Sequence, residues 1–202
     1  MACSILIPTY NRSQFDALIS DNITKQRYPF ISEVLIADDG SEQLNITCPY
    51  PIRYFTVPRC SIGTKRNFLI SRATTEYCAF FDTDDEYSEH FISKSIFNLI
   101  QSGKSISGSS DMVMRKNGVL YKSRCMYRDM LNEATLVFKR SHPGNFSDAS
   151  TGEGISFLRE YIKDIVETDI ESLMICNVHE GNTVPKDGWI DEKYRIKDLK
   201  KN

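Results

Sequence analysis

The tripeptide Asp82-Thr83-Asp84 has residue types and spacing that suggest chemistry directly. Alternate residues of an extended segment point the same way, so the two carboxylates could share a divalent cation. Hard oxygen ligands of this kind suit Mg²⁺ or Mn²⁺. The preceding apolar run, residues 77–81 (YCAFF), is typical of a buried strand and places the acids at its end. The alternative is a loop of solvated acids that caps a helix starting near Ser88.

A second acidic cluster and a basic segment could complete such a site. Residues 38–41 (DDGS) follow another apolar run. Asp39 could accept hydrogen bonds from a nucleobase there, or the cluster could be only a turn. Lys65, Arg66 and Arg72 lie on one segment with helical patterning. Arg66 could meet the acids after residue 81 and neutralise a diphosphate, whereas a solvated helix face is the alternative for each basic residue.

Hydrophobic periodicity in the first hundred residues alternates between strand and helix patterns. Strands are expected over residues 4–7, 33–37, 52–57 and 77–81, and helices over residues 13–23, 63–73 and 88–101. This order predicts an α/β fold with a Rossmann-like, mostly parallel central sheet and helices on both faces. Ligands bind such sheets at the carboxyl ends of the strands, where residues 8–12, 38–41 and 82–85 would converge.

The second half has a less regular pattern, and we expect it to form a smaller, irregular part of a single domain. Short strands are expected over residues 111–114 and 118–121 around a turn at residues 116–117, and over residues 134–138 and 172–178. An amphipathic helix is expected over residues 153–166. The charged tail from residue 191 predicts a solvated terminal helix or a linker.

Composition excludes several classes of protein. The 202 residues suffice for one domain with a real core, and the formal net charge of −2 argues against binding to nucleic acid through bulk basic charge. No apolar run reaches the ~18 residues of a membrane span, and the N-terminus lacks the basic region of a signal peptide. The six cysteines show no CxxC or zinc spacing, so we expect reduced thiols in a cytoplasmic protein.

Four segments resemble, in order and spacing, the motifs of family 2 glycosyltransferases. They are residues 4–12 (SILIPTYNR), 33–41 (EVLIADDGS), 63–67 (GTKRN) and 80–85 (FFDTDD), within about the first 100 residues. The resemblance implies the GT-A fold and an inverting enzyme that uses Mn²⁺ or Mg²⁺. It also implies a nucleotide-sugar donor, usually UDP-linked, and a glycan or other hydroxyl acceptor. The compact size resembles the small glycosyltransferase modules of chlorella viruses.

The resemblance also implies roles for parts of the chain and for single residues. Residues 1–103 would bind the nucleotide-sugar and residues 104–190 the acceptor, with residues 191–202 as a charged tail. Thr9 and Asp39 match nucleobase-contacting positions, and Arg66 matches a basic position near the diphosphate. The full set expected to bind the donor is Pro8, Thr9, Tyr10, Arg12, Asp39, Arg66, Asp82 and Thr83.

The resemblance also implies metal ligands and a catalytic base in the second half. Residues 177–183 (NVHEGNT) resemble a late segment that offers a metal-ligating histidine, so His179 would join Asp82 and Asp84; a structural histidine is the alternative. Family members usually carry a Glu-Asp pair, including the base, at the start of a helix. Here residues 150–158 (STGEGISFL) place Gly154 where the Asp would stand. We predict Glu153 as the base and Asp148 as the second candidate; Glu153 could instead be a first-turn acid that favours the helix dipole.

The residues leave two rival functions open. A phosphohydrolase of the haloacid dehalogenase type also has a DxD after a strand, although its motif normally lies near the N-terminus and is followed by Thr or Val. A non-catalytic module that binds nucleotide-sugars or glycans would fit the Gly at position 154. A dehydrogenase is not expected, because no GxGxxG follows the first strand.

Overall fold

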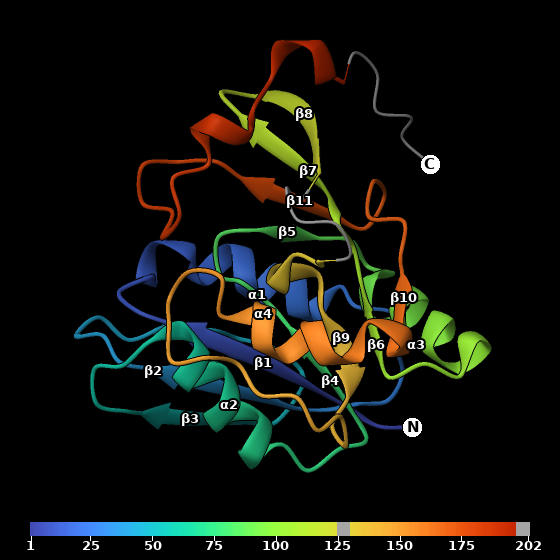
Figure 1. Ribbon diagram of the computed structural model, residues 1–202. Helices are drawn as coiled ribbons and strands as arrows, with labels where there is room; N and C mark the ends of the chain where they lie inside the picture. The colour runs from blue at the N-terminus through green and yellow to red at the C-terminus, as the bar shows by residue number, and fades with distance from the viewer. Residues whose placement is uncertain (125–129, 197–202) are drawn as a thin grey trace.

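A seven-stranded sheet forms the centre of the molecule in the computed structural model, which describes residues 1–124 and 130–196 (Figure 1). The strand order is β10-β6-β9-β4-β1-β2-β3, and β9 alone runs antiparallel to its neighbours among these strands. Its strands are β1 (Cys3–Thr9), β2 (Ile31–Asp38), β3 (Ile52–Thr56), β4 (Tyr77–Phe80), β6 (Ile106–Gly108), β9 (Val137–Lys139) and β10 (Ile165–Glu167). The expected mostly parallel α/β sheet is therefore confirmed.

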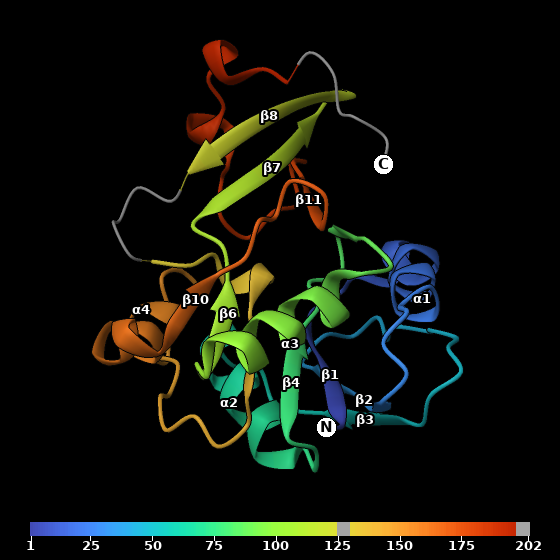
Figure 2. The same ribbon diagram turned by 90° about the vertical axis from the view of Figure 1, so that its right-hand side faces the viewer.

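Helices cover both faces of this sheet, as the sequence predicts (Figures 1 and 2). The helices α1 (Asp16–Thr24) and α3 (Phe91–Ser102) pack on one face, where Ile5 and Ile7 of β1 are buried with them. The helices α2 (Ile62–Arg72) and α4 (Gly154–Leu158) pack on the other face with Leu6. Because alternate residues of a strand point to opposite faces, β1 is buried on both sides and reads as a continuous apolar run.

A second, four-stranded sheet lies beside the first, at the top of Figure 1. Its order is β5-β11-β7-β8, with β5 (Glu86–Tyr87), β11 (Met174–Asn177), β7 (Asp111–Lys116) and β8 (Val119–Arg124). The β7–β8 hairpin turns at Asn117 and Gly118, which both have positive φ angles. Two such residues favour the tight turn that joins antiparallel strands. The predicted turn is confirmed, whereas β5, β6 and β10 were too short to be recognised in the sequence.

The predicted helix over residues 153–166 is wrong. Helix α4 ends at Leu158, a 3₁₀ segment follows over Arg159–Asp164, and residues 165–167 form β10 beside β6. The backbone leaves the helical conformation at Tyr161 (φ −120°). Phe157 and Leu158 fill the core against α2, but the 3₁₀ segment has no buried side chain to hold a longer helix in place.

The tail is also different from the expected terminal helix or linker. A 3₁₀ turn spans Glu192–Tyr194, and Ile196 N donates to Leu120 O (2.8 Å) in β8. Tyr121 donates its hydroxyl to Glu192 Oε1 (2.9 Å). These contacts attach residues 192–196 to the second sheet, and residues 197–202 lie outside the described residues. The remaining short helices span Ser13–Phe15, Glu133–Thr135 and Asp187–Trp189.

The described cysteines are free thiols, in agreement with the expected reduced state. Cys3, Cys78 and Cys176 are buried in the core, and Cys125 lies outside the described residues. Within residues 1–124 and 130–196, no helix has the length and apolar character needed to cross a membrane.

Candidate active site

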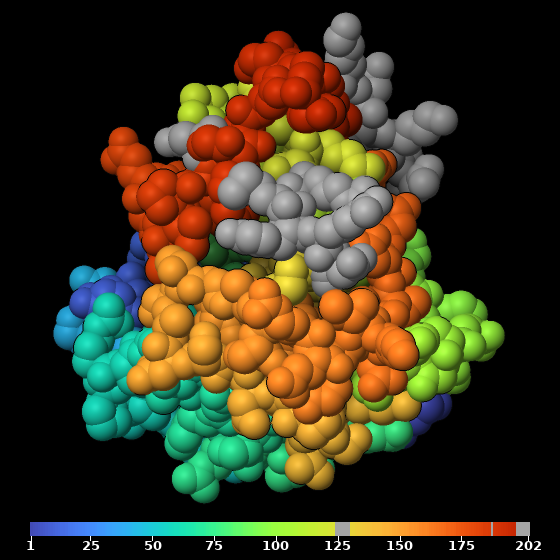
Figure 3. All heavy atoms as spheres, viewed as in Figure 1, coloured from blue at the N-terminus to red at the C-terminus, as the bar shows by residue number. Residues whose placement is uncertain are grey.

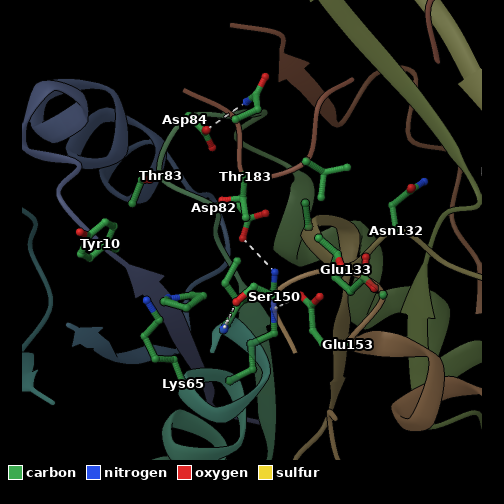
Figure 4. A pocket seen from close by; sticks show the side chains of 18 of the residues that line it. Tyr10, Lys65, Asp82, Thr83, Asp84, Asn132, Glu133, Ser150, Glu153 and Thr183 are labelled. Atoms are coloured by element: carbon green, nitrogen blue, oxygen red, sulfur yellow. Dashed lines mark hydrogen bonds and ion pairs between the residues drawn. The ribbon is translucent and has the colours of Figure 1, made fainter. Parts of the chain in front are cut away.

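A cleft of about 650 Å³ opens at the carboxyl ends of β1 and β4, beside the N-terminal half of α2 (Figure 4). Pro8, Thr9 and Tyr10 from β1 and the following loop line it, together with the segment after β4. The far wall comes from residues 130–134, 150–155 and 182–189. Figure 3 shows the red C-terminal segment lying against the orange segment around α4 on this side of the molecule. The strand-end convergence predicted from the sequence is therefore present.

The ends of β1 and β2 are fastened to each other by Asn11. Its side-chain Oδ1 accepts hydrogen bonds from the backbone of Ser41 (2.8 Å) and Glu42 (3.1 Å). Gly40 is needed beside it, because a Cβ there would lie only 2.4 Å from Asn11 Oδ1. Asn11 itself has a positive φ of 49°, which Asn tolerates better than most residues. This junction fixes the loop that carries Asp39 next to the loop after β1.

Asp39 lies under the cleft and not on its surface. Its Oδ1 accepts from Lys65 Nζ (2.5 Å), and its Oδ2 accepts from Arg59 Nη1 (2.9 Å) and Cys60 N (3.0 Å). Burial alone would raise the pKa of Asp39, but the bonds from Cys60 and Lys65 outweigh it, so the pKa is lowered. Lys65 also donates to Thr9 O (2.8 Å). Asp39 is thus a buried anion that orients Lys65, and its predicted contact with a nucleobase stays a prediction.

Arg66 is the buried cation of the cleft. Its Nη2 donates to Asp82 Oδ1 (3.2 Å), and its Nε lies 3.4 Å from Glu153 Oε1 in an ion pair. Burial disfavours the charge, but the carboxylates of Asp82 and Glu153 outweigh it and raise the pKa of Arg66. The guanidinium packs 4.5 Å from the ring centroid of Phe80. Its Nε and Nη1 are buried and make no hydrogen bond with the residues that the structure describes, so Nη1 can still donate to an anion.

The part of the cleft at the end of β1 has two notable groups. The hydroxyl of Thr9 is buried at the end of β1 and has no hydrogen-bond partner within residues 1–124 and 130–196. Tyr10 is 42% exposed, and the guanidinium of Arg59 lies 3.6 Å from its ring centroid. Thr83 also lines the cleft, although it is only 4% exposed. These positions agree in place with the residues predicted to bind the donor.

Asp84 lies on the opposite side of the cleft among hydrogen-bond donors. Its Oδ2 accepts from His179 Nε2 (3.0 Å) and Asn182 Nδ2 (3.2 Å), and Arg12 Nη1 lies 4.0 Å away. Arg12 itself donates to the backbone oxygen of Gly181 (2.6 Å). The structure therefore places His179 beside Asp84, the residue it was expected to join, and adds Arg12, which the sequence analysis assigned to the donor.

The fit of this region to a divalent cation is partial. Asp82 Oδ2 and Asp84 Oδ1 lie outside the contacts just described, and two carboxylate oxygens suit Mg²⁺ or Mn²⁺. His179 fits less well, because the backbone of Gly181 donates to its Nδ1 (3.1 Å). That bond leaves the proton on Nε2, which donates to Asp84, whereas a ligating Nε2 must be unprotonated. Within the described parts of the chain, no three His, Cys, Asp or Glu side chains are arranged to hold a metal.

Two expected residues lie away from the cleft. Asp148 is exposed and accepts from Ser61 Oγ (2.6 Å) and Thr64 Oγ1 (2.8 Å) at the start of α2. These bonds lower its pKa. Arg72 is exposed at the other end of α2, beside Phe68. Arg72 therefore does not face the acids as expected, and of the two acids predicted as the base only Glu153 lines the cleft.

The sequence analysis missed two charged residues of the site, Glu133 and Lys186. Glu133 lines the cleft from the 3₁₀ turn before β9, and burial, its largest influence, raises its pKa. Lys186 also lines the cleft and donates to Cys176 Sγ (2.8 Å). It lies near Asp85, whose pKa burial raises to about 8 despite this cation. Neither position follows a recognisable strand, so no periodic signal could have found it.

Comparison with known proteins identifies the family. A profile of the family "Glycosyl transferase family 2" matches residues 4–165. No curated protein matches the sequence. The profile covers both the strand-end motifs and the segment that contains Glu153. It favours the resemblance noted from the motifs over a haloacid dehalogenase-type phosphohydrolase.

Solved structures share the fold at low sequence identity. S. aureus TarS 1–349 in complex with UDP-GlcNAc has a TM-score of 0.68 and 17% identity over 90% of this chain and 60% of its own. The longer S. aureus TarS chain has a TM-score of 0.67 and 16% identity, over 88% of this chain and 37% of its own. PcManGT, a mannosyltransferase from Pyrobaculum calidifontis in complex with GDP-Man and Mn²⁺, has a TM-score of 0.61 and 15% identity, over 93% and 58%. The chain thus spans between about a third and three fifths of these neighbours, and it shares their GT-A fold.

Proposed function

The chain belongs to glycosyl transferase family 2, and from this premise we propose that it transfers a sugar from a nucleotide-sugar to a hydroxyl acceptor. The observation that carries the proposal is Arg66. This buried guanidinium lines the cleft at the strand ends and has two nitrogen atoms without hydrogen-bond partners. A diphosphate would supply acceptors for them, because guanidinium groups bind phosphate oxygens in pairs.

We propose a UDP-sugar as the donor. The nucleoside would lie against Tyr10 and the buried hydroxyl of Thr9, and the diphosphate would extend towards Arg66. TarS binds UDP-GlcNAc and PcManGT binds GDP-Man, so neighbours with this fold bind nucleotide-sugars with different bases. Lys65 Nζ already donates to Asp39 and to Thr9 O, whereas Nη1 of Arg66 has no hydrogen-bond partner among the described residues, so Arg66 is the better donor to the diphosphate.

The proposed reaction is a single displacement that inverts the anomeric carbon. The acceptor oxygen attacks this carbon while its bond to the diphosphate oxygen breaks, and the electron pair leaves with the diphosphate. Arg66 stabilises the negative charge that develops on the leaving group. A carboxylate of the far wall takes the acceptor proton, and the sequence predicts Glu153 for this role. Asp82 and Asp84 would hold a divalent cation, which would act as a Lewis acid on the diphosphate when bound.

A thermal-shift screen tests the donor directly. Ligands that bind the native state raise its apparent stability by mass action. UDP, GDP, CDP and dTDP, each with and without MnCl₂, would be compared at one concentration. We expect UDP with Mn²⁺ to give the largest increase in melting temperature. If none of the four nucleotides shifts the melting temperature, the proposal is wrong.

Replacement of Asp84 tests the role of the metal. Asp84→Ala should abolish the Mn²⁺-dependent part of the UDP shift, because it removes one of the two carboxylates offered to the cation. Asp21→Ala is a matched control, since Asp21 is an exposed acid that pairs with Lys25 on α1. An undiminished Mn²⁺ effect in Asp84→Ala would exclude Asp84 as a metal ligand.

A further inference from the structure

Glu133 is a cleft carboxylate whose role the family resemblance does not assign. It belongs to a 3₁₀ turn before β9, twenty residues ahead of Glu153. Figure 4 shows its side chain directed towards the same part of the cleft as Glu153. Both acids interact electrostatically with Arg66, and the charge of Glu153 raises the pKa of Glu133. The far wall therefore presents two carboxylates to one cation.

The position of Glu133 is explained by Gly154. The backbone of Gly154 donates to Glu133 Oε1 (3.1 Å). A Cβ at position 154 would lie only 2.5 Å from that oxygen, 2.7 Å from Cγ and 2.9 Å from Cδ of Glu133. Any side chain at position 154 would thus occupy the space that the Glu133 carboxylate fills. An acid from another element stands where residue 154 would otherwise place its own side chain.

The two carboxylates differ in how strongly neighbouring groups bind them. Glu153 Oε1 is ion-paired with Arg66 Nε at 3.4 Å, and Asp82 Oδ1 accepts from Nη2 of the same guanidinium. Glu133 makes no direct ion pair with Arg66, and its contact with Gly154 uses one oxygen only. A carboxylate held by a cation is a weak base, whereas a desolvated one without a direct ion pair is a better proton acceptor. Burial, the largest influence on Glu133, also raises its pKa.

We infer that Glu133, and not Glu153, is the general base, and that Glu153 positions Arg66. This inference rests on the proposed transfer reaction. The proton of the acceptor hydroxyl passes to the Glu133 carboxylate as the acceptor oxygen bonds to the anomeric carbon. The bond between that carbon and the diphosphate oxygen breaks with its electron pair on the diphosphate. Arg66 of α2 and Glu153 at the start of α4 are the charged groups that face Glu133.

The first test measures UDP release from UDP-glucose, UDP-galactose and UDP-N-acetylglucosamine with MnCl₂, using water as the acceptor. Glu133→Gln should lower kcat for UDP release by about 10²-fold or more, the range expected for loss of a general base. Its thermal shift with UDP should match that of the wild type. Glu153→Gln should lower kcat less and weaken UDP binding, because it loosens Arg66. Full activity of Glu133→Gln would overturn the inference.

A relocated carboxylate gives the sharper test. In Glu133→Ala the space beside position 154 is empty. Adding Gly154→Asp should therefore raise the rate of UDP release at least tenfold above that of Glu133→Ala alone. Glu133→Ala with Gly154→Asn has the same shape without the charge and should restore none. Gly154→Asp alone should lower the activity, because its side chain displaces Glu133. Equal rates in the Asp and Asn double variants would overturn the assignment of the base.

The stability of variants at positions 133 and 154 tests whether the two side chains share the same space, independently of the transfer reaction. Gly154→Ala should lower the unfolding free energy more in the wild-type background than in the Glu133→Ala background, because its Cβ meets the Glu133 side chain only in the wild type. Additive changes in unfolding free energy would contradict the shared space. A wild-type protein that neither binds UDP nor releases it would contradict the proposed function, even if the stability coupling between positions 133 and 154 were present.

Discussion

Arg66 and Asp84 lie on two sides of one cleft, and the groups that surround them differ in kind. Arg66 is a cation among carboxylates that come from the end of β4, the start of α4 and the turn before β9. Asp84 is a carboxylate among donors that come from the loop after β1 and from residues 179–182. Among the described residues, Nη1 of Arg66 has no hydrogen-bond partner and Nε has only the ion pair with Glu153, whereas Oδ2 of Asp84 accepts two hydrogen bonds.

This difference indicates which side of the cleft can bind a ligand with less rearrangement. Nη1 on the Arg66 side can receive a diphosphate oxygen without breaking a hydrogen bond or ion pair among the described residues. The Asp84 side must release hydrogen bonds from His179 and Asn182 before its carboxylate can coordinate a cation fully. In the proposed function, the diphosphate would bind at groups held by strand ends and a helix, whereas the cation site proposed at Asp84 is shared with a loop. Preorganised groups lose less free energy on binding.

Removing Arg66 should have the largest effect on the molecule. Arg66→Ala leaves three buried or half-buried acids without their cation, so we expect a loss of about 3–5 kcal/mol in unfolding free energy. Arg66→Lys keeps the charge and should fold, but it should lose most UDP binding because it lacks the planar fork. Denaturant unfolding and the UDP thermal shift measure these effects.

The control is Arg72→Ala, on the same helix but exposed beside Phe68. We expect its unfolding free energy to change by less than about 0.5 kcal/mol, as for ordinary surface substitutions. Similar losses in the Arg66 and Arg72 variants would break the distinction between a buried anion site and a solvated helix face.

The next largest difference should separate Asp84 from His179. Asp84→Ala should remove the Mn²⁺ dependence of UDP binding, whereas His179→Ala should change the half-saturating Mn²⁺ concentration by less than about fivefold. The reason is that Nε2 of His179 carries a proton directed at Asp84. Titration of the UDP thermal shift with MnCl₂ measures both. Loss of Mn²⁺ dependence in His179→Ala would instead support His179 as a ligand.

Asp39 should show its role through pH. Asp39→Asn should cost about 1.5–3 kcal/mol at neutral pH, the range for hydrogen bonds to a charged group. Because the folded protein lowers the pKa of Asp39, its stabilisation is complete above the ordinary value of 3.8 and is lost as the pH falls through the folded-state pKa. The free-energy gap between the wild type and Asp39→Asn should therefore shrink with acidification, as measured by unfolding from pH 7 to pH 3. A gap independent of pH would mean that Asp39 is not ionised in the fold.

The smallest effect is expected at Asp148. It is exposed, lies outside the cleft and only accepts bonds from Ser61 and Thr64. Asp148→Ala should leave kcat for UDP release within about twofold of the wild type, since no proton transfer reaches it. A loss comparable to that of Glu133→Gln would return Asp148 to consideration as the base.

The sheet and its strand-end motifs could be predicted because each is a local pattern. The apolar run before Pro8 indicates a buried strand, and the acids at positions 82–85 indicate where another strand ends; both signals lie within a few residues of sequence. The family profile and the fold confirm this part of the sequence analysis. The donor-side residues lie where strands end, so the parallel order of the sheet brings them together.

The far wall could not be predicted because its residues meet through long-range contacts. Glu133 fills space beside Gly154, and Lys186 reaches Cys176, in segments without helical or strand periodicity. The helix predicted over residues 153–166 failed for a similar reason. Its amphipathic pattern continues past Leu158, but none of the side chains of Arg159–Asp164 is fully buried to stabilise a helix.

Turnover of a UDP-sugar by the wild-type chain tests the central claim most directly. UDP release would be measured from UDP-glucose, UDP-galactose and UDP-N-acetylglucosamine with MnCl₂ and again with excess EDTA. We predict release from at least one donor, and its loss with EDTA or in Arg66→Lys. Binding of UDP without release from any of the three donors would contradict a transferase and support a module that only binds nucleotide-sugars.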